Sequence, residues 1–162
     1  MSNALQTVSL SSGALASRVS TQAQSFVTMR VANQLFGASV MMVQDVLRAQ
    51  RIAPIPLSAK EVAGSLNLRG RIITVIDMRQ RLGLPPIENP QSAMHVVVEY
   101  NDELCSLMVD CVGDVLNLPM DQIEKTPANL ETLWKDIAAG VFRLDSELIV
   151  LLDIQSILTF KV

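Results

Sequence analysis

The sequence predicts a mainly β protein built from two copies of one small unit, on two observations. Short apolar stretches rich in Val, Ile and Leu recur along the chain between Gly, Pro, Asn and Asp residues, which is the pattern of strands joined by tight turns. The motif V-x-x-V-x-D-V-L occurs at residues 40–47 and again at residues 109–116, without a gap and at an offset of 69. We therefore expect an internal duplication.

The first copy begins after a tail. Residues 1–24 are rich in Ser, Ala, Gln and Thr and carry too few regular apolar positions to pack, so they are predicted to be a mobile tail. Residues 26–31 and 36–40 then predict a hairpin around residues 32–34. After the first motif, Pro54 and Pro56 interrupt regular structure, Ser58 is predicted to cap a helical turn over residues 59–63, and Gly64 is predicted to end it.

Residues 66–84 predict a turn, a buried strand and a capped helical turn. Gly70 supplies the backbone freedom for a turn between Leu68 and Ile72, and the β-branched run that begins at Ile72 favours an interior strand. Asp77 is predicted to cap a helical turn, with Gln80 completing a capping box.

The second copy repeats this order. Residues 94–100 predict a strand followed by a hairpin turn at 101–102, and residues 148–154 repeat residues 72–78 at an offset of 76. Additional residues around 144–147 account for the larger offset, and Asp153 takes the role of Asp77.

These elements predict the fold class. A repeat of about 65 to 70 residues is too small to be comfortably stable alone, and short strands of this kind close into small barrels that remove exposed edges. We expect two five-stranded Src-homology-3-like β-barrel subdomains packed around a shared hydrophobic core, with short helices. The domain spans residues 25–160, with barrels at about 25–88 and 92–160, between which an exchange of strands is left open.

Composition limits the class of protein. The 162 residues are 49% hydrophobic and only 4% aromatic, so the core must be built from aliphatic side chains. The apolar runs are far shorter than the roughly 20 residues of a membrane-spanning helix, and the N-terminus lacks the pattern of a secretory signal. We expect a cytoplasmic protein without membrane insertion.

Charge is distributed unevenly along the chain. Residues 25–87 hold eight basic and three acidic residues, whereas residues 88–162 hold four basic and thirteen acidic ones. Four of the basic residues flank one strand: Arg69, Arg71, Arg79 and Arg81. Arginines on a rigid support suit protein recognition, since guanidinium groups pair with carboxylates. The alternative is a basic-faced nucleic-acid-binding β-barrel, which the scarcity of aromatic residues disfavours.

Catalytic motifs are missing from the sequence. The single histidine, His95, has no arrangement of acid and nucleophile around it and is expected to be structural or on the surface. Cys105 and Cys111 are interpreted as small buried hydrophobic residues rather than a disulfide. There is no glycine-rich phosphate loop, zinc-binding spacing or nucleophile elbow. We expect no enzyme, no cofactor and no metal site.

The order of these features resembles the CheW family of bacterial chemotaxis coupling proteins over about residues 25–160. The resemblance is carried by Val43 to Arg48, by the N-L-R-G stretch at 67–70 with its downstream V-x-D-M-R, and by the second motif at 109–116. It implies a non-enzymatic adaptor that joins the cytoplasmic tips of methyl-accepting chemoreceptors to the regulatory domain of the histidine kinase CheA. Such a protein is cytoplasmic and is recruited to membrane-associated receptor arrays.

The resemblance also implies which residues bind the receptor: Arg69, Val43 and Asp45. The family commonly has Glu where Asp45 stands, and the shorter side chain reaches less far. The kinase-binding residues stay unknown. Each of the three has a structural alternative, in which Arg69 only bonds carbonyls of its own turn, Val43 is a core residue and Asp45 is a local cap.

Overall fold

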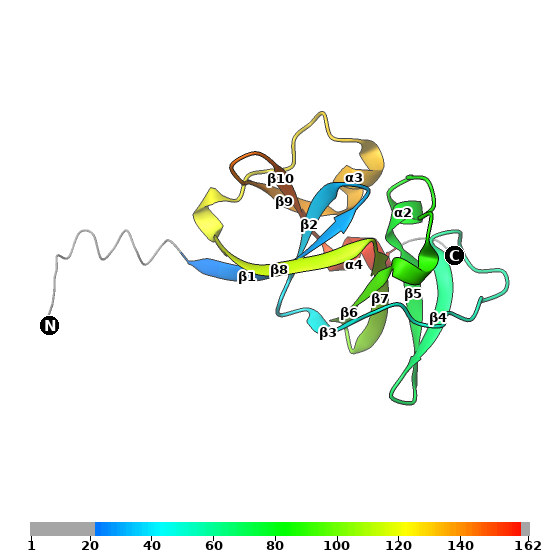
Figure 1. Ribbon diagram of the computed structural model, residues 1–162. Coiled ribbons are helices and arrows are strands. Elements are labelled where there is room, and N and C mark those ends of the chain that lie inside the picture. The colour runs from blue at the N-terminus through cyan, green and yellow to red at the C-terminus, as the bar shows by residue number, and fades with distance from the viewer. Residues whose placement is uncertain (1–21, 160–162) are drawn as a thin grey trace, which may run out of the picture.

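The computed structural model describes residues 22–159 and contains two five-stranded sheets with a few short helices (Figure 1). Most of the tail that we predicted for residues 1–24 lies outside the described residues. The strands are β1 (Ala23–Val31), β2 (Gln34–Ser39), β3 (Val43–Leu47), β4 (Val62–Leu68), β5 (Arg71–Asp77), β6 (Met94–Tyr100), β7 (Glu103–Val109), β8 (Cys111–Pro119), β9 (Ala138–Arg143) and β10 (Leu148–Leu152).

The helices are short. They are α2 (Met78–Arg81), α3 (Thr132–Ile137) and α4 (Ile154–Leu158), with 3-10 turns at Pro90–Ser92 and Met120–Gln122. No helix within residues 22–159 has the length and apolar character needed to cross a lipid bilayer. The mainly β fold class is confirmed.

The two sheets have the same internal order. Sheet A is β8-β1-β2-β10-β9 and sheet B is β3-β6-β7-β5-β4. Replacing each strand of sheet A by the strand five places away in the chain reproduces the order of sheet B. Sheet A therefore takes two strands, β1 and β2, from the first half of the chain and three from the second, whereas sheet B takes three from the first half and two, β6 and β7, from the second. Within residues 22–159, no strand ladder joins the two edges of either sheet into a closed barrel.

The hydrophobic core has three parts. Alternate residues of a strand point to opposite faces of its sheet, so a strand that is buried on both sides contributes to two clusters. In β10, Ile149 and Leu151 lie inside sheet A, whereas Val150 and Leu152 face the central cluster that both sheets share. Sheet B encloses a third cluster of Leu66, Ile73, Val75 and Val97. The shared core predicted between the two halves is present as the central cluster.

Turns and caps follow the local sequence. The β1–β2 hairpin turns at Ala32 and Asn33, and the β6–β7 hairpin turns at Asn101 and Asp102, all with positive φ as in type I′ turns. The carboxylate of Asp77 accepts hydrogen bonds from the backbone N–H groups of Arg79 and Gln80, which confirms its role as an N-cap.

The reciprocal half of the predicted capping box is not made. The backbone N–H of Asp77 donates instead to the carbonyl of Glu61, at 2.8 Å. The segment before β4 supplies that carbonyl, so a long-range contact takes the place of the local one.

The helical turn predicted over residues 59–63 is wrong. The chain makes turns there, and β4 begins at Val62. Ser58 donates its hydroxyl to the carbonyl of Ile55 instead of capping a helix. Gly64 is needed for close packing, because a Cβ atom on it would lie 2.3 Å from the carbonyl oxygen of Ala53. The preceding loop therefore crosses β4 at the glycine.

Candidate protein-interaction site

The β4–β5 hairpin presents Arg69 at its tip. Leu68 pairs with Arg71, and between them Arg69 and Gly70 have φ angles of 52° and 85°, a type I′ turn. The side-chain oxygen of Asn67 accepts a hydrogen bond from the backbone N–H of Gly70 at 2.9 Å, which fixes the turn. Arg69 is therefore carried on a rigid support, with 77% of its side chain exposed.

Arg69 and Asp45 are in direct contact. Nη2 of Arg69 lies 2.9 Å from Oδ2 of Asp45. Asp45 is on β3, and Arg69 directly follows β4. Strands β3 and β4 are the two opposite edges of sheet B, so the ion pair links those edges. An exposed pair of this kind contributes at most about 1 kcal/mol to stability. Most of the Arg69 guanidinium stays available to a partner.

Asp45 and Val43 combine local and exposed roles. The other carboxylate oxygen of Asp45 accepts a hydrogen bond from the backbone N–H of Val46, so Asp45 is also a local cap. Val43 lies opposite Val98 of β6 and packs against the central cluster while staying partly exposed. The structure thus brings Arg69 and Asp45 together and places Val43 at the margin of the core. Arg69 makes no hydrogen bond to a carbonyl of its own turn within the described part of the chain.

Several large apolar side chains are exposed, which the sequence did not predict. Ile72, predicted to be interior, has 72% of its surface exposed. It lines a cavity of about 320 Å³ together with Arg51 and Asn67. Val46 is also exposed, and Leu57 is fully so. Ile73 and Val75 point to the buried face of β5, and Ile72 points to the other face. Its place next to the turn was the sequence feature that could have predicted its exposure.

Two of the four predicted recognition arginines are internal. Arg79 donates from Nε and Nη2 to the two carboxylate oxygens of Asp110, at 2.9 and 2.6 Å, and this bond lowers the pKa of the Asp110 carboxyl. Arg81 is buried and donates to the carbonyls of Ser156 and Ile157 at the end of α4. The exposed basic surface is therefore smaller than the sequence suggested, which weakens the nucleic-acid alternative.

The remaining titratable candidates are structural. His95 is 1% exposed, and its Nδ1 lies 3.0 Å from Oγ of Ser106. Cys105 and Cys111 are both free thiols, as expected, but Cys111 is exposed, so its predicted burial is wrong. β8 is an edge strand, which leaves Cys111 uncovered. Residues 22–159 contain no group of three or more potential metal ligands.

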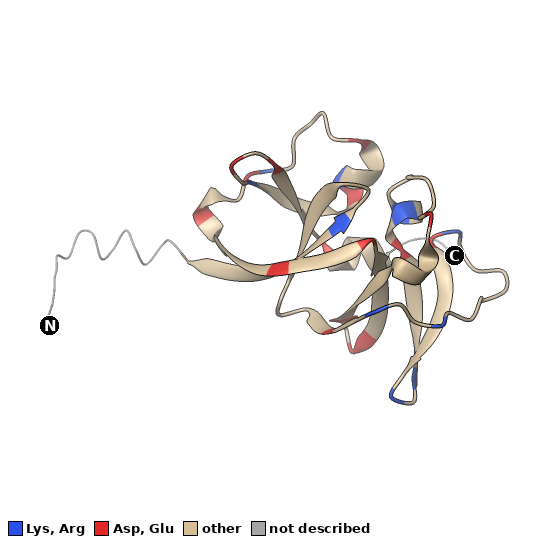
Figure 2. Cartoon of the chain, viewed as in Figure 1, with Lys and Arg blue, Asp and Glu red and all other residues tan. Residues whose placement is uncertain are grey.

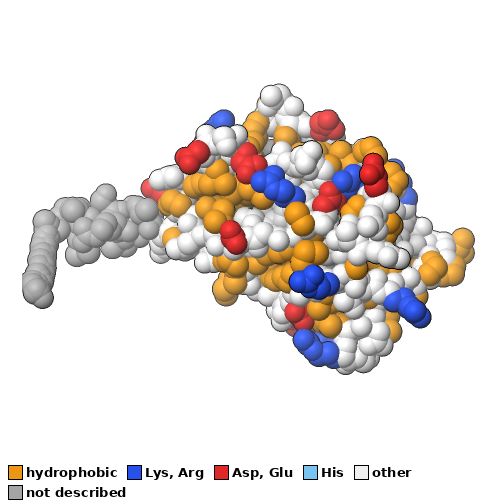
Figure 3. Space-filling view, in the orientation of Figure 1, with side chains coloured by type: hydrophobic (Ala, Val, Ile, Leu, Met, Phe, Trp, Pro, Cys, Tyr) orange, Lys and Arg blue, Asp and Glu red, His pale blue; other side chains and the backbone are white. Residues whose placement is uncertain are grey.

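The tip of the β4–β5 hairpin and the loop between β9 and β10 carry opposite charges. In Figure 2 the tip of the β4–β5 hairpin carries arginines, whereas acidic residues mark the loop between β9 and β10. Figure 3 shows apolar side chains between charged groups on the visible face. Such a surface, formed by two stacked sheets with a rigid arginine-bearing hairpin, defines a scaffold that binds other proteins.

Comparison with known proteins agrees with that class. Residues 25–161 match the CheW-like domain family, and the chain belongs to this family. Relatives in this family are named chemotaxis protein CheW and scaffolding protein, so the expectation that the chain is not an enzyme is confirmed.

The relatives cover most of the chain. The chemotaxis protein CheW of Klebsiella aerogenes is 26% identical over 139 residues, which cover 86% of this chain and 84% of the relative. Protein PilI of Pseudomonas aeruginosa is 29% identical over 135 residues, covering 82% and 75%. The crystal structure of the scaffolding protein TtCheW from Thermoanaerobacter tengcongensis superposes with a TM-score of 0.73 at 27% identity, covering 80% of this chain and 88% of that one.

Proposed function

We propose that this protein couples chemoreceptors to a CheA-type histidine kinase, with Arg69, Asp45 and Val43 at the receptor-binding surface. The observation that carries the proposal is the exposed guanidinium of Arg69 on the fixed tip of a hairpin, within a chain of the CheW-like domain family. The partners are the cytoplasmic tip of a methyl-accepting receptor and the regulatory domain of the kinase. The protein would act in the cytoplasm, at membrane-associated receptor arrays.

The organisation of the chain supports a purely geometric mechanism. A single domain over residues 25–160, made of two interleaved halves, offers separate surfaces on a common core. An adaptor that holds receptor and kinase at a fixed spacing raises the effective concentration of one for the other. A change in the receptor can then bias the kinase equilibrium through differential contacts, without chemistry by the adaptor.

The ion pair with Asp45 sets how Arg69 is presented. Asp45 holds one nitrogen of the guanidinium, and the other donors remain for carboxylate or carbonyl groups of the receptor. Exposed apolar neighbours such as Ile72 and Val46 supply a rim that excludes water from those bonds.

The proposal is tested by Arg69→Glu. We expect this substitution to weaken receptor coupling by about 1 to 3 kcal/mol, because it removes an interface arginine and places two carboxylates together. Receptor-stimulated kinase activity in a reconstituted mixture measures the effect, and circular dichroism checks the fold. Lys60→Glu is the matched control, since it makes the same change in charge at an exposed residue away from the hairpin tip. Normal kinase stimulation by folded Arg69→Glu protein would reject the role of Arg69.

A further inference from the structure

The loop between β3 and β4 exposes large apolar side chains at a convex tip. Leu57 is fully exposed, and Ile55 has 38% of its surface exposed. The loop protrudes at the right-hand side of Figure 1, and Figure 3 shows apolar side chains on that protrusion. Neighbouring apolar side chains left in water mark a contact with another molecule or with a lipid surface.

The backbone of this tip has few free hydrogen-bonding groups. Pro54 and Pro56 have no N–H, and the carbonyl of Ile55 accepts a hydrogen bond from the hydroxyl of Ser58 at 2.8 Å. At the base of the loop, the backbone of Ala53 exchanges two hydrogen bonds with β4. Moving the tip out of water therefore leaves few donors unpaired, and unpaired donors are the main cost of placing irregular backbone near lipid.

Basic residues flank the tip on both sides. Arg48, Arg51 and Lys60 are exposed, and none of them forms an ion pair with any residue from 22 to 159. Between residues 46 and 68 the only acid is Glu61. Figure 2 shows basic positions on both limbs of the loop. An apolar tip is thus combined with a surplus of positive charge.

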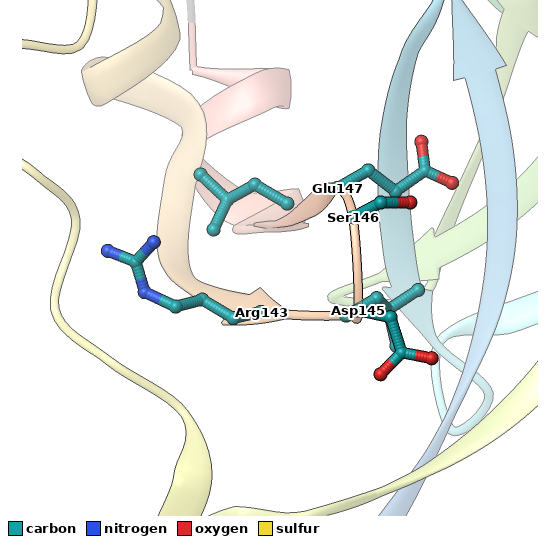
Figure 4. A pocket seen from close by; sticks show the side chains of 6 residues that line it. Arg143, Asp145, Ser146 and Glu147 are labelled. Carbon is teal, nitrogen blue, oxygen red and sulfur yellow. The ribbon is translucent and has the colours of Figure 1, made fainter.

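Acidic residues mark a different loop. Asp145 and Glu147 lie between β9 and β10, and Figure 4 shows their side chains from close by. That loop lies on another side of the molecule from the β3–β4 loop (Figure 1). An anionic surface attracts the basic loop and repels the acidic one, so it favours a single orientation of the molecule.

We propose that the β3–β4 loop is a peripheral docking site for an anionic lipid bilayer. Leu57 and Ile55 enter the boundary between headgroups and acyl chains, while the flanking cations stay at the level of the lipid phosphates. A bilayer suits this loop better than a folded partner, because fluid lipid can surround a side chain that projects from a convex tip and needs no matching pocket.

The contact is a surface contact. The expectation of no membrane insertion rested on the lack of apolar runs long enough to span a bilayer, whereas a peripheral contact needs only a few exposed apolar side chains beside basic ones. Because the attraction is largely electrostatic, it is weak and falls as salt is added. This inference does not depend on the proposed receptor or kinase.

The test is co-sedimentation of the full chain with vesicles of phosphatidylcholine, with or without an equal part of phosphatidylglycerol, at low and high salt. We expect binding to the anionic vesicles at low salt, loss of that binding at high salt, and no binding to phosphatidylcholine alone. Arg51→Gln should weaken binding about fivefold, which is the contribution of one cation near an anionic surface.

Leu57→Asn should weaken binding by a similar factor, because it removes the apolar tip. Asparagine tolerates the φ of 61° at this position, so the loop keeps its shape. Two matched controls lie outside the loop. Met41→Asn replaces a side chain that is 81% exposed, and Lys125→Gln removes an exposed cation. Both should bind like the unmodified protein.

A chain that does not bind anionic vesicles at low salt overturns the proposal. So does binding that either Arg51→Gln or Leu57→Asn leaves unchanged, since the contact requires both the charge and the apolar tip. Loss of receptor-stimulated kinase activity in Leu57→Asn, without vesicle binding by the unmodified protein, would assign the loop to a protein contact instead. Failure of these results leaves the Arg69→Glu experiment unaffected.

Discussion

His95 shows how one residue distinguishes the two equivalent halves. The hairpin registers make His95 and Ser106 the counterparts of Phe26 and Gly37. In sheet A the Cβ of Phe26 lies close to Gly37, whereas sheet B buries an imidazole bonded to a hydroxyl. Burial lowers the pKa of His95, so the folded state holds this ring neutral.

That burial makes stability depend on pH. Below about pH 6.5 the unfolded chain takes up a proton at His95 that the folded chain refuses, so the free energy of unfolding falls as pH is lowered, by up to about 1.4 kcal/mol per pH unit. We predict that His95→Gln, which keeps a hydrogen-bonding side chain without the titration, removes this slope between pH 6.5 and 5. Urea unfolding over that range measures it.

The titration of Asp110 falls outside the pH range of this measurement. The pKa of Asp110 is also lowered, and its stabilisation is lost only as pH falls below about 4. Identical slopes for His95→Gln and the unmodified chain between pH 6.5 and 5 would contradict the assignment to His95.

At the scale of elements, one ion pair joins α2 to turns from both sheets. Arg79 of α2 binds Asp110 between β7 and β8, and Asp110 also accepts the backbone N–H of Ala32 in the β1–β2 turn. Three segments from both sheets therefore meet at one carboxylate.

We predict that Asp110→Asn destabilises the protein by about 2 kcal/mol, because a half-buried guanidinium loses its charge partner. Urea unfolding gives the value. Asp114→Asn is the matched control: this exposed carboxylate forms no ion pair within the described part of the chain, so its removal should change stability by less than about 0.5 kcal/mol. Equal effects of the two substitutions would show that the Asp110 bridge is unimportant.

The elements that the sequence predicted correctly are those specified locally. The I′ turns at Ala32–Asn33 and Asn101–Asp102 and the caps at Asp77 and Asp153 depend on residues within a few positions of each other. The partners of Arg79 and Arg81 lie 31 and 75 or more residues away, so neither could be distinguished in advance from an exposed arginine.

In the candidate site, too, local features were predictable from the sequence and long-range contacts were not. The turn that presents Arg69 was predictable from Gly70, and the receptor-binding role proposed for Arg69 rests on the family resemblance. Its contact with Asp45 crosses 24 residues and depends on the curvature of sheet B, which no local pattern encodes. The exposure of Ile72 likewise depends on how far the hairpin projects beyond the core.

At the scale of the molecule, strand exchange makes the two halves depend on each other. The first half contributes β1 and β2 to sheet A but β3, β4 and β5 to sheet B, and the second half does the reverse. The central cluster also draws on both halves, from Phe36 and Ile76 to Leu107 and Ile157. Neither half alone can complete a sheet or cover its apolar surface, although each has the strand content of a small barrel.

We predict that fragments 1–88 and 89–162 are each unfolded when produced separately and form the native fold when mixed. The cut falls in the exposed segment before Pro90 and breaks no strand. An isolated fragment lacks the partner strands for long-range pairings such as β1 with β8 and β5 with β7. It therefore loses both the hydrogen bonds of those strand pairs and the burial of its apolar residues in the central cluster. Amide NMR spectra of each fragment and of the equimolar mixture measure the outcome. Dispersed native-like spectra from either fragment alone would contradict the prediction. They would mean that one half can close its own barrel, and that strands are exchanged only when both halves are present.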